Sequence, residues 1–268
     1  METSLDTVEP VGNANSTRTE SKYDLMPEKL RLSPLRETFF EVQFEPVIPT
    51  AGDILPGLLY GQMKTEYPEV MPLPMANVPR NVRQQNPDLH YQASHRLHGP
   101  SGSILVGDRV ISLTTLEYPG WKLFKARLLS LVQALRATEQ AKIVTRFSFK
   151  YINLIEASAE EAQLSFLNMK IESVGAPPSE RGFLMRTEIA QDKHTTIIQI
   201  APRSEIKVPP GNSTISGLLV DVDTIRFDPG PEFILNPDLL LEEAHLVAKK
   251  IFFSLLTPSA VERLQPVW

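Results

Sequence analysis

Two segments of this chain place apolar residues at helical spacing on one face only, and they constrain the fold more than any other feature. The first begins at Pro119, and its apolar positions are Trp121, Phe124, Leu128, Leu131, Val132 and Leu135. The second extends from Asn236, its predicted N-cap, to about Leu256, with apolar positions at Leu240, Ala244, Val247, Ala248, Ile251, Phe252 and Leu255. A helix with one apolar face is stable when that face packs against another element. The sequence therefore predicts two long amphipathic helices that cover a common layer.

Alternation of apolar and polar residues predicts that this layer is a β-sheet. Between residues 36 and 46, Thr38, Phe40, Val42 and Phe44 alternate with polar residues, the pattern of a half-buried strand. Further strands are predicted at residues 89–97, 103–106, 109–114, 145–156, 183–190, 195–201 and 217–227. We expect an α+β fold in which an antiparallel sheet carries both long helices on one face and leaves its polar face open.

The elements follow the same order in each half of the chain: strand, short helix, two or three strands, long helix. The short helices are predicted at about residues 53–66 and 159–167. This order suggests two similar units, residues 27–143 and 144–268, in one globular body. The pattern leaves open whether their strands form one continuous sheet. Residues 1–26 lack hydrophobic periodicity and are predicted to form a disordered tail.

The composition excludes several functional classes. The 268-residue chain has no cysteine, so it holds no disulfide, thiolate metal site or cysteine nucleophile. Its formal charge is −5 at pH 7, and lysines and arginines are scattered singly, which disfavours nucleic acid as the main ligand. No signal peptide is recognisable, and no apolar run approaches the roughly 20 residues of a membrane span. We expect a cytoplasmic protein that does not cross a membrane.

A proline-rich segment from Pro68 to Pro87 is predicted to be irregular and is longer than the connections that usually join elements in compact domains. It carries Arg80 and Arg83. One interpretation is a recognition segment in an extended, polyproline-like conformation. The other is a long connection without a binding role.

Two aspartates on a predicted strand are candidates for chemistry. Asp221 and Asp223 are two residues apart, so both carboxylates point to one face, as a divalent metal ion or an acid–base pair requires. A solvated strand face is the other explanation, because the sequence places no third ligand beside them. His90, His95 and His98 match no zinc-binding spacing and are expected at the surface. His194, beside the tip of a hairpin predicted around residues 191–193, is also expected to be exposed. Neither a metal site nor a cofactor is predicted.

Other strands carry polar side chains that a partner or ligand face requires. Arg146 and Lys150 share one face of the 145–156 strand, Arg186 and Glu188 share a face of the 183–190 strand, and Glu37 and Glu41 share a face of the 36–46 strand. If neighbouring strands bring them together, they form cross-strand ion pairs. Such a face is either solvated or a charged surface for a partner or an anionic metabolite. Asn153 interrupts an apolar strand face, and its amide either satisfies backbone groups or points into a ligand site.

Four short motifs occur in order along the chain: Leu32 to Glu37 before a strand, Tyr67-Pro68 at a helix end, Tyr118 to Trp121 at a helix start, and the arginine-led strand from Arg146 to Asn153 with its Tyr-Ile-Asn. Together they resemble a sporadically distributed bacterial family of uncharacterised proteins, from about residue 30 to the end. Phe149-Lys150 departs from the family's pattern, which has a second aromatic residue or an arginine there. The resemblance implies no activity or cofactor. The sporadic distribution implies, by analogy, a toxin-neutralising or defence-associated role.

The familiar catalytic signatures are missing, since neither a P-loop, a dinucleotide fingerprint nor a G-x-S-x-G elbow occurs. We therefore expect a non-enzymatic module that binds a protein partner or a small ligand through the open sheet face and the proline-rich segment. The competing hypothesis is a metal-dependent hydrolase that uses Asp221, Asp223 and one of the histidines. The oligomeric state is left open by the sequence.

Overall fold

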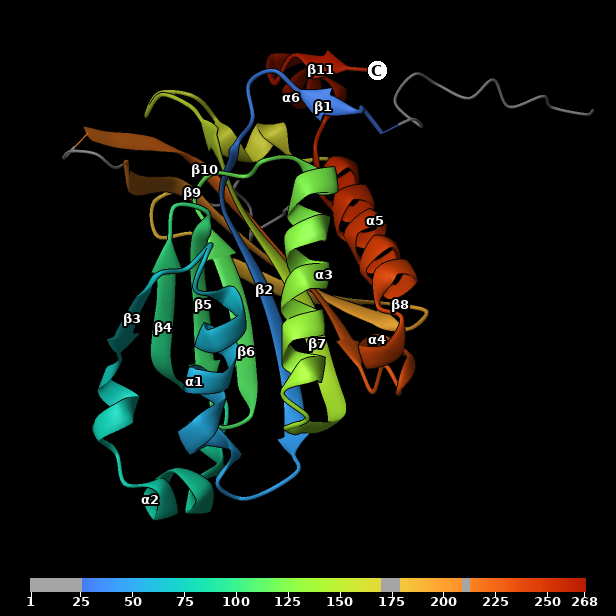
Figure 1. Ribbon diagram of the computed structural model, residues 1–268. Helices are drawn as coiled ribbons and strands as arrows, with labels where there is room; N and C mark the ends of the chain where they lie inside the picture. The colour runs from blue at the N-terminus through green and yellow to red at the C-terminus, as the bar shows by residue number, and fades with distance from the viewer. Residues whose placement is uncertain (1–25, 170–178, 209–212) are drawn as a thin grey trace, which may run out of the picture.

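One antiparallel sheet of nine strands organises the molecule (Figure 1). The computed structural model describes residues 26–169, 179–208 and 213–268, so the tail expected over residues 1–26 lies outside the described residues except for Met26. The strand order is β3-β4-β5-β6-β2-β7-β10-β9-β8. The bounds are β2 Leu35–Pro46, β3 Glu69–Pro72, β4 Ala93–Gly99, β5 Gly102–Gly107, β6 Val110–Thr115, β7 Ala141–Glu156, β8 Met185–Gln191, β9 His194–Val208 and β10 Ser213–Phe227.

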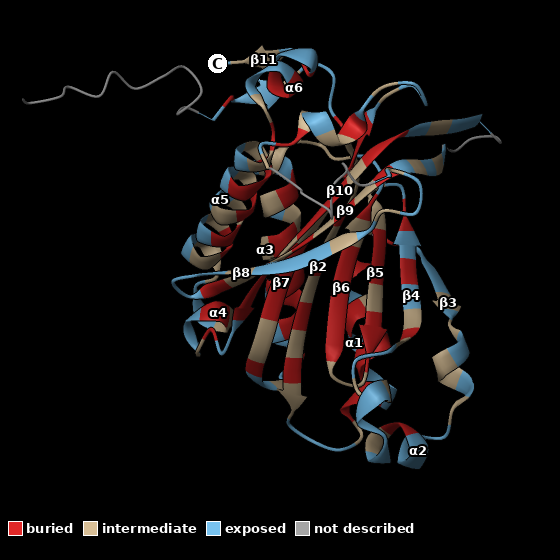
Figure 2. Cartoon of the chain, turned by 180° about the vertical axis from the view of Figure 1, so that it is seen from behind, coloured by how far each residue is buried: buried red, intermediate tan, exposed pale blue. Residues whose placement is uncertain are grey.

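Three helices pack against the same face of this sheet: α1 (Ala51–Met63), α3 (Trp121–Ala137) and α5 (Asp238–Leu255). The two longest are the helices that the apolar stripes predict, so the expected α+β fold is confirmed. Seen from behind, the strands lie in front of these helices, and no helix of the described chain covers the opposite face (Figure 2). We call this opposite side the open face.

Shorter elements complete the fold. They are η2 (Pro74–Asn77), α2 (Arg80–Gln85), η3 (Pro87–Leu89), η4 (Gln163–Phe166), α4 (Glu232–Leu235), α6 (Pro258–Arg263) and a small second sheet of β1 (Lys29–Leu30) with β11 (Pro266–Val267). Thr257 caps α6 as its sequence suggests, because its hydroxyl oxygen accepts a hydrogen bond from the Ala260 N–H while Pro258 occupies the first turn. No helix of the described chain is long and apolar enough to cross a membrane.

The two halves of the chain meet in the middle of the sheet, where β2 pairs with β7. Phe40 lies opposite Phe149 there, with 5.1 Å between ring centroids. Apolar side chains beneath α1, α3 and the start of α5 form one core cluster, and those beneath the rest of α5 form a second. Tyr151 on β7 packs against both clusters. The sheet is therefore continuous across the two predicted units.

The sheet twists strongly along its width. β9 and β10 run at a steep angle to β4, β5 and β6 in both views (Figures 1 and 2). A register shift between Gly217 and Leu219 adds to the irregularity of β10. The position of Gly217 tolerates no side chain, because a Cβ atom there would lie 2.1 Å from the Ile155 carbonyl oxygen.

Some local predictions were wrong. Instead of the helix expected at residues 159–167, only the 3-10 turn η4 forms, because side chains bond to backbone groups of this segment. The Leu164 N–H donates to the Glu180 carboxylate. The Gln163 side chain donates to the Ser158 carbonyl oxygen and accepts from the Arg203 N–H. Asn236 does not cap α5; it ends α4, and Pro237 precedes the first turn of α5. The proline-rich segment is not irregular, since β3, η2, α2 and η3 lie within it.

Candidate functional site

The strand register gathers polar side chains from β2, β7 and β10 on the open face. Glu41 lies opposite Ser148, and Lys150 lies opposite Asp223. Since side chains alternate between the faces of a strand, residues two apart join them on the same side. The resulting group, which we call the polar cluster, comprises Glu41, Arg146, Ser148, Lys150, Asp221 and Asp223.

Ion pairs connect the polar cluster across the three strands. Arg146 Nη1 lies 2.7 Å from Glu41 Oε1, and its Nη2 lies 3.9 Å from Asp223 Oδ2. Lys150 Nζ lies 2.9 Å from Asp221 Oδ2. These are the cross-strand ion pairs that the sequence predicts for neighbouring strands, since β7 lies between β2 and β10.

Asp221 is buried and Asp223 is half-buried, although no helix covers them. Asp221 is 6% exposed. Its Oδ2 accepts a hydrogen bond from Gln199 Nε2 on β9 at 3.2 Å in addition to the Lys150 contact. In contrast, Oδ1 of Asp221 and Oδ1 of Asp223 are both buried and have no hydrogen-bond partner among the described residues. Two carboxylate oxygens with unused acceptor capacity therefore lie on the same face of β10.

Burial changes the protonation of these carboxyls. It raises the pKa of Asp223 to about 6, although the nearby Arg146 and Lys150 charges act in the opposite direction. Burial also raises the pKa of Asp221, and the Lys150 ammonium offsets part of this effect. A perturbed carboxyl with an unpaired oxygen is typical of a functional site, although structural ion-pair networks also shift pKa values. The geometry makes the pair a strong acceptor for hydrogen-bond donors and positive charge.

The other candidates from these strands lie outside the polar cluster. Asn153 is on the helix-covered face, where its Nδ2 donates to the Tyr151 and Val220 carbonyl oxygens at 3.2 Å each. Its amide therefore satisfies backbone acceptors inside the sheet. Arg186 and Glu188 lie on the outer strand β8 and form an ion pair of 3.0 Å, with both side chains 53% exposed.

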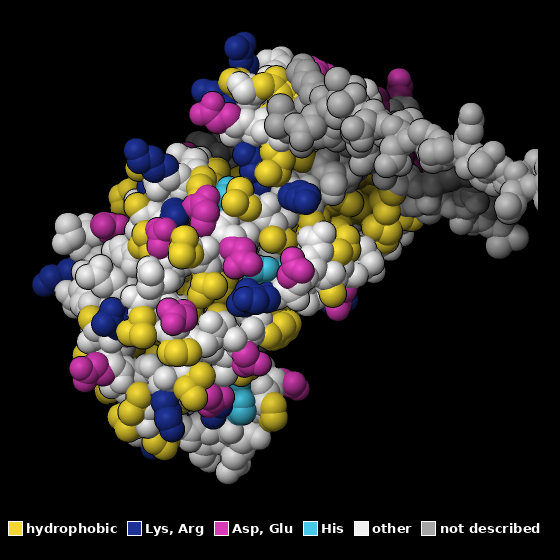
Figure 3. All heavy atoms as spheres, turned by 90° about the vertical axis from the view of Figure 1, so that its right-hand side faces the viewer, with side chains coloured by type: hydrophobic (Ala, Val, Ile, Leu, Met, Phe, Trp, Pro, Cys, Tyr) yellow, Lys and Arg dark blue, Asp and Glu magenta, His cyan; other side chains and the backbone are white. Residues whose placement is uncertain are grey.

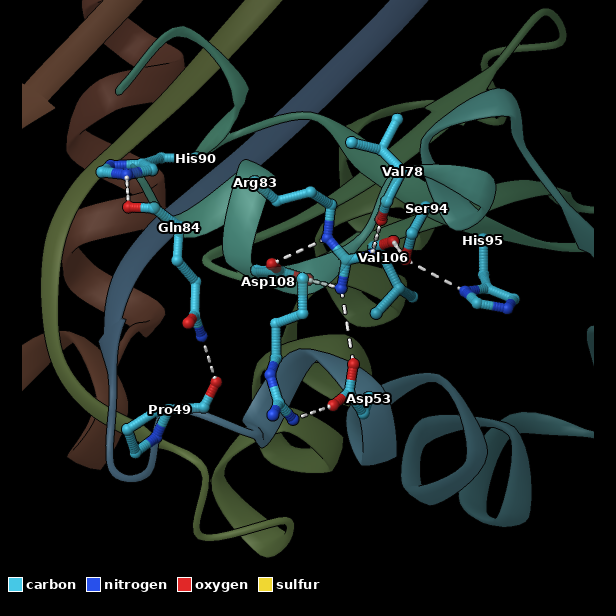
Figure 4. A network of polar contacts seen from close by, with 11 residues as sticks. Pro49, Asp53, Val78, Arg83, Gln84, His90, Ser94, His95, Val106 and Asp108 are labelled. Carbon is cyan, nitrogen blue, oxygen red and sulfur yellow. Dashed lines mark hydrogen bonds and ion pairs between the residues drawn. The ribbon is translucent and has the colours of Figure 1, made fainter. Parts of the chain in front are cut away.

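The two arginines of the proline-rich segment are held by internal contacts (Figure 4). Arg83 is buried, and its Nε and Nη2 each lie 3.0 Å from an oxygen of Asp108. Its Nη1 donates to the Val78 carbonyl oxygen at 2.8 Å. Arg80 forms a 2.6 Å ion pair with Asp53 on α1. These contacts fix the segment against the sheet, beside a hollow of about 360 Å³ that Asp108 also lines.

The histidines do not form a common site. His90 follows η3 and lies 2.9 Å from the Gln84 carbonyl oxygen, while His95 and His98 on β4 contact Ser94 and Ser103. His194 is buried, not exposed as a hairpin tip suggests, because it is the first residue of β9, which packs beneath α5. No three His, Asp or Glu side chains lie close enough to hold a metal ion in the part of the chain that the structure describes.

A second polar group joins α3 to α5 on the covered face. The His245 ring stacks on the half-buried Trp121 indole with 3.8 Å between centroids and 9° between planes. His245 Nδ1 lies 2.9 Å from the Tyr151 hydroxyl, and the Trp121 Nε1–H donates to Glu242 at 2.9 Å. Burial lowers the pKa of His245 to about 4. The ring is therefore neutral at pH 7, and the tautomer decides whether Nδ1 or the Tyr151 hydroxyl is the donor of their shared hydrogen bond.

Of two further contributors to the site, Gln199 is not predicted from the sequence, whereas Glu41 is predicted only as a candidate for a cross-strand ion pair. Glu41 belongs to the acidic side of its alternating strand, but only the register shows that it reaches Arg146. Gln199 carries no sequence signal, since it is one polar residue within a β-branched strand. Comparison of the chain with protein-family models, curated proteins and solved structures finds no match.

Proposed function

We propose that the protein is a non-enzymatic binding module whose open face receives a protein partner at the polar cluster. One observation carries this proposal. The Oδ1 atoms of Asp221 and Asp223 are buried without a partner among the described residues, whereas both cations of the cluster already contact carboxylates. A buried, unpaired acceptor destabilises the fold. A binding site explains this loss of stability, because a bound ligand supplies the missing hydrogen-bond donor.

The charges of the polar cluster indicate the chemistry of the contacting group. Three carboxylates and two cations leave a net charge of about −1 when all five groups are ionised. The unused atoms are acceptors, so they favour a donor that carries positive charge, such as a lysine or arginine side chain of a partner. An anionic metabolite would meet unpaired carboxylate oxygens instead. A cationic side chain of a protein is therefore the best fit, and a small cationic ligand is the second.

The metal-dependent hydrolase hypothesis has less support. It requires a third ligand beside Asp221 and Asp223 and an open coordination position. Within the described ranges of the chain, no suitable group of three carboxylate or imidazole side chains exists. No other feature of the cluster favours this hypothesis over binding.

A pull-down with matched variants tests the proposal. The tagged wild type, the double variant Asp221→Asn/Asp223→Asn and the control Glu160→Gln, which changes an exposed carboxylate, are recovered from native cells. We expect a stoichiometric protein with the wild type and the control. The double variant should recover at least about tenfold less, since each hydrogen bond to a charged group contributes about 1.5 to 3 kcal/mol. Undiminished recovery by the double variant contradicts the proposal.

A panel of small cations covers the other ligand class. If no protein is captured, binding of a small ligand should raise the melting temperature of the wild type and leave that of the double variant unchanged. The absence of both a captured protein and a thermal shift removes the support for a binding function.

The toxin-neutralising or defence-associated setting stays a prediction from the family resemblance. It predicts that the captured protein arrests growth when it is expressed alone. Co-expression of the wild-type chain should restore growth, and co-expression of the Asp221→Asn/Asp223→Asn variant should not. Normal growth with the captured protein alone argues against this setting.

A further inference from the structure

The outer strand β8 presents an edge that the sheet does not use. It pairs with β9 on one side, and no strand of the described chain pairs with its other side. Arg186 and Glu188 are each 53% exposed, and Leu184 just before the strand is 68% exposed. An exposed strand edge is a template for pairing with another strand unless charges or bulges prevent it.

The connection to β9 determines which backbone groups point outward. Gln191 and His194 are paired across the two-residue turn of Asp192 and Lys193. The pair that flanks such a turn exchanges both hydrogen bonds, and the pattern then alternates along an antiparallel ladder. Residues 190, 188 and 186 therefore direct their N–H and C=O groups away from β9. These groups are available to a strand from another chain.

The charge pattern of β8 is complementary to itself in one antiparallel register. When a two-fold axis passes through Thr187, Arg186 lies opposite the partner's Glu188, and Glu188 lies opposite the partner's Arg186. Both residues of each opposed pair carry outward backbone groups, so they can exchange two hydrogen bonds. In the same register, Met185 lies opposite the partner's Ile189 on the covered side of the sheet. An axis through Arg186 or Glu188 instead would place like charges opposite each other.

We propose that two copies of this chain associate through β8 in the register centred on Thr187, so that their nine-stranded sheets become continuous. In the single chain, the 3.0 Å pair of Arg186 and Glu188 is exposed and contributes little to stability. In the dimer, each charge has an opposite charge both along its own strand and across the axis. The side of the molecule that bears α5 shows both signs of charge interspersed, without a field of one sign that would repel a second copy (Figure 3). This association is independent of the polar cluster.

Charge reversal at two positions tests the proposal. Sedimentation velocity of the full chain from about 1 to 200 μM should show a monomer–dimer equilibrium. Arg186→Glu alone, or Glu188→Arg alone, puts like charges opposite each other twice and should raise the dissociation constant at least about tenfold. The double variant Arg186→Glu/Glu188→Arg restores opposite charges and should associate like the wild type. Circular dichroism and the melting temperature establish that each variant is folded.

A mixture of the two single variants provides the sharpest test. Arg186→Glu carries two acidic residues on β8 and Glu188→Arg carries two basic ones, so the mixture should form a heterodimer although neither variant dimerises alone. A wild type that stays monomeric over the whole concentration range overturns the proposal. Dimers that persist in a single variant, or a mixture that does not associate, contradict the β8 register.

Discussion

Replacement of Asp223 by asparagine should make the protein more stable at neutral pH. Asparagine keeps the shape of the half-buried side chain and removes its charge. Burial raises the pKa of Asp223 from 3.8 to about 6, which corresponds to about 3 kcal/mol of free energy of unfolding. Because the folded pKa lies above the unfolded value, the carboxyl favours folding most below pH 3.8, and this contribution is lost as pH rises through about 6. Because asparagine does not ionise, Asp223→Asn removes this loss of stability above about pH 6.

Urea unfolding at pH values from about 3.5 to 8 measures this effect. The Asp223→Asn variant and the wild type should unfold at similar urea concentrations near pH 3.5, and the variant should gain up to about 3 kcal/mol above pH 7. The exposed-site control Glu160→Gln should follow the wild type. A variant that is less stable than the wild type by more than about 1 kcal/mol at pH 7.5 would refute the reasoning, since Asp223 would then stabilise the fold as a paired charge.

Three further outcomes follow from the structure. Phe252→Ala should lower the free energy of unfolding, measured in urea, by about 3 to 5 kcal/mol, because the ring is only 8% exposed and packs in the core beneath α5. A loss below about 1 kcal/mol would contradict this packing. Arg83→Ala should lower the free energy of unfolding by about 3 to 5 kcal/mol, because Asp108 would lose both hydrogen bonds from Arg83. Arg83→Lys should restore only part of this lost stability. Equal stability of the wild type and both variants would contradict this. Because the pKa of His245 is lowered from 6.5 to about 4, the free energy of unfolding should fall as pH drops from about 6.5 toward 4. In parallel unfolding curves, His245→Gln should flatten this dependence of stability on pH. An unchanged dependence would contradict the assignment.

The contributions of His245 and Asp223 to stability depend on pH in opposite directions, which matters for these measurements. His245 loses stability as pH falls over the same range in which Asp223 gains it, because one folded pKa is lowered and the other raised. The wild-type curve alone therefore shows only their sum. The difference between the wild type and each variant isolates the contribution of one residue.

Much of the fold could be predicted from the sequence because its signals are local. The alternation of Phe40, Val42 and Phe44 marks β2, and all three side chains are fully buried in the structure. The stripe from Phe124 to Leu135 predicts the buried side of α3. These patterns arise from the periods of strand and helix and require no knowledge of partners.

The site depends on long-range register, which the sequence does not encode in a readable pattern. The spacing of Asp221 and Asp223 predicts that they share one face of a strand. Their contacts with Lys150 and Arg146 depend on the pairing of β7 with β10, which the spacing does not predict. Asp108 follows a glycine in an apparent turn, and only the structure shows that it holds Arg83. The same limit explains His194, which a hairpin tip suggests is exposed and which tertiary packing buries.

Photo-crosslinking in native cells tests the binding role of the open face most directly. A photoreactive leucine analogue replaces Ile152, which lies opposite Asp221 on β7, and in a second protein it replaces Leu246, an exposed residue of α5. The proposal predicts a discrete crosslinked protein from position 152 and none from position 246. It also predicts that Asp221→Asn/Asp223→Asn abolishes the adduct at 152. A crosslink from position 246 alone, or one at 152 that the double variant leaves unchanged, would contradict a binding site at the polar cluster.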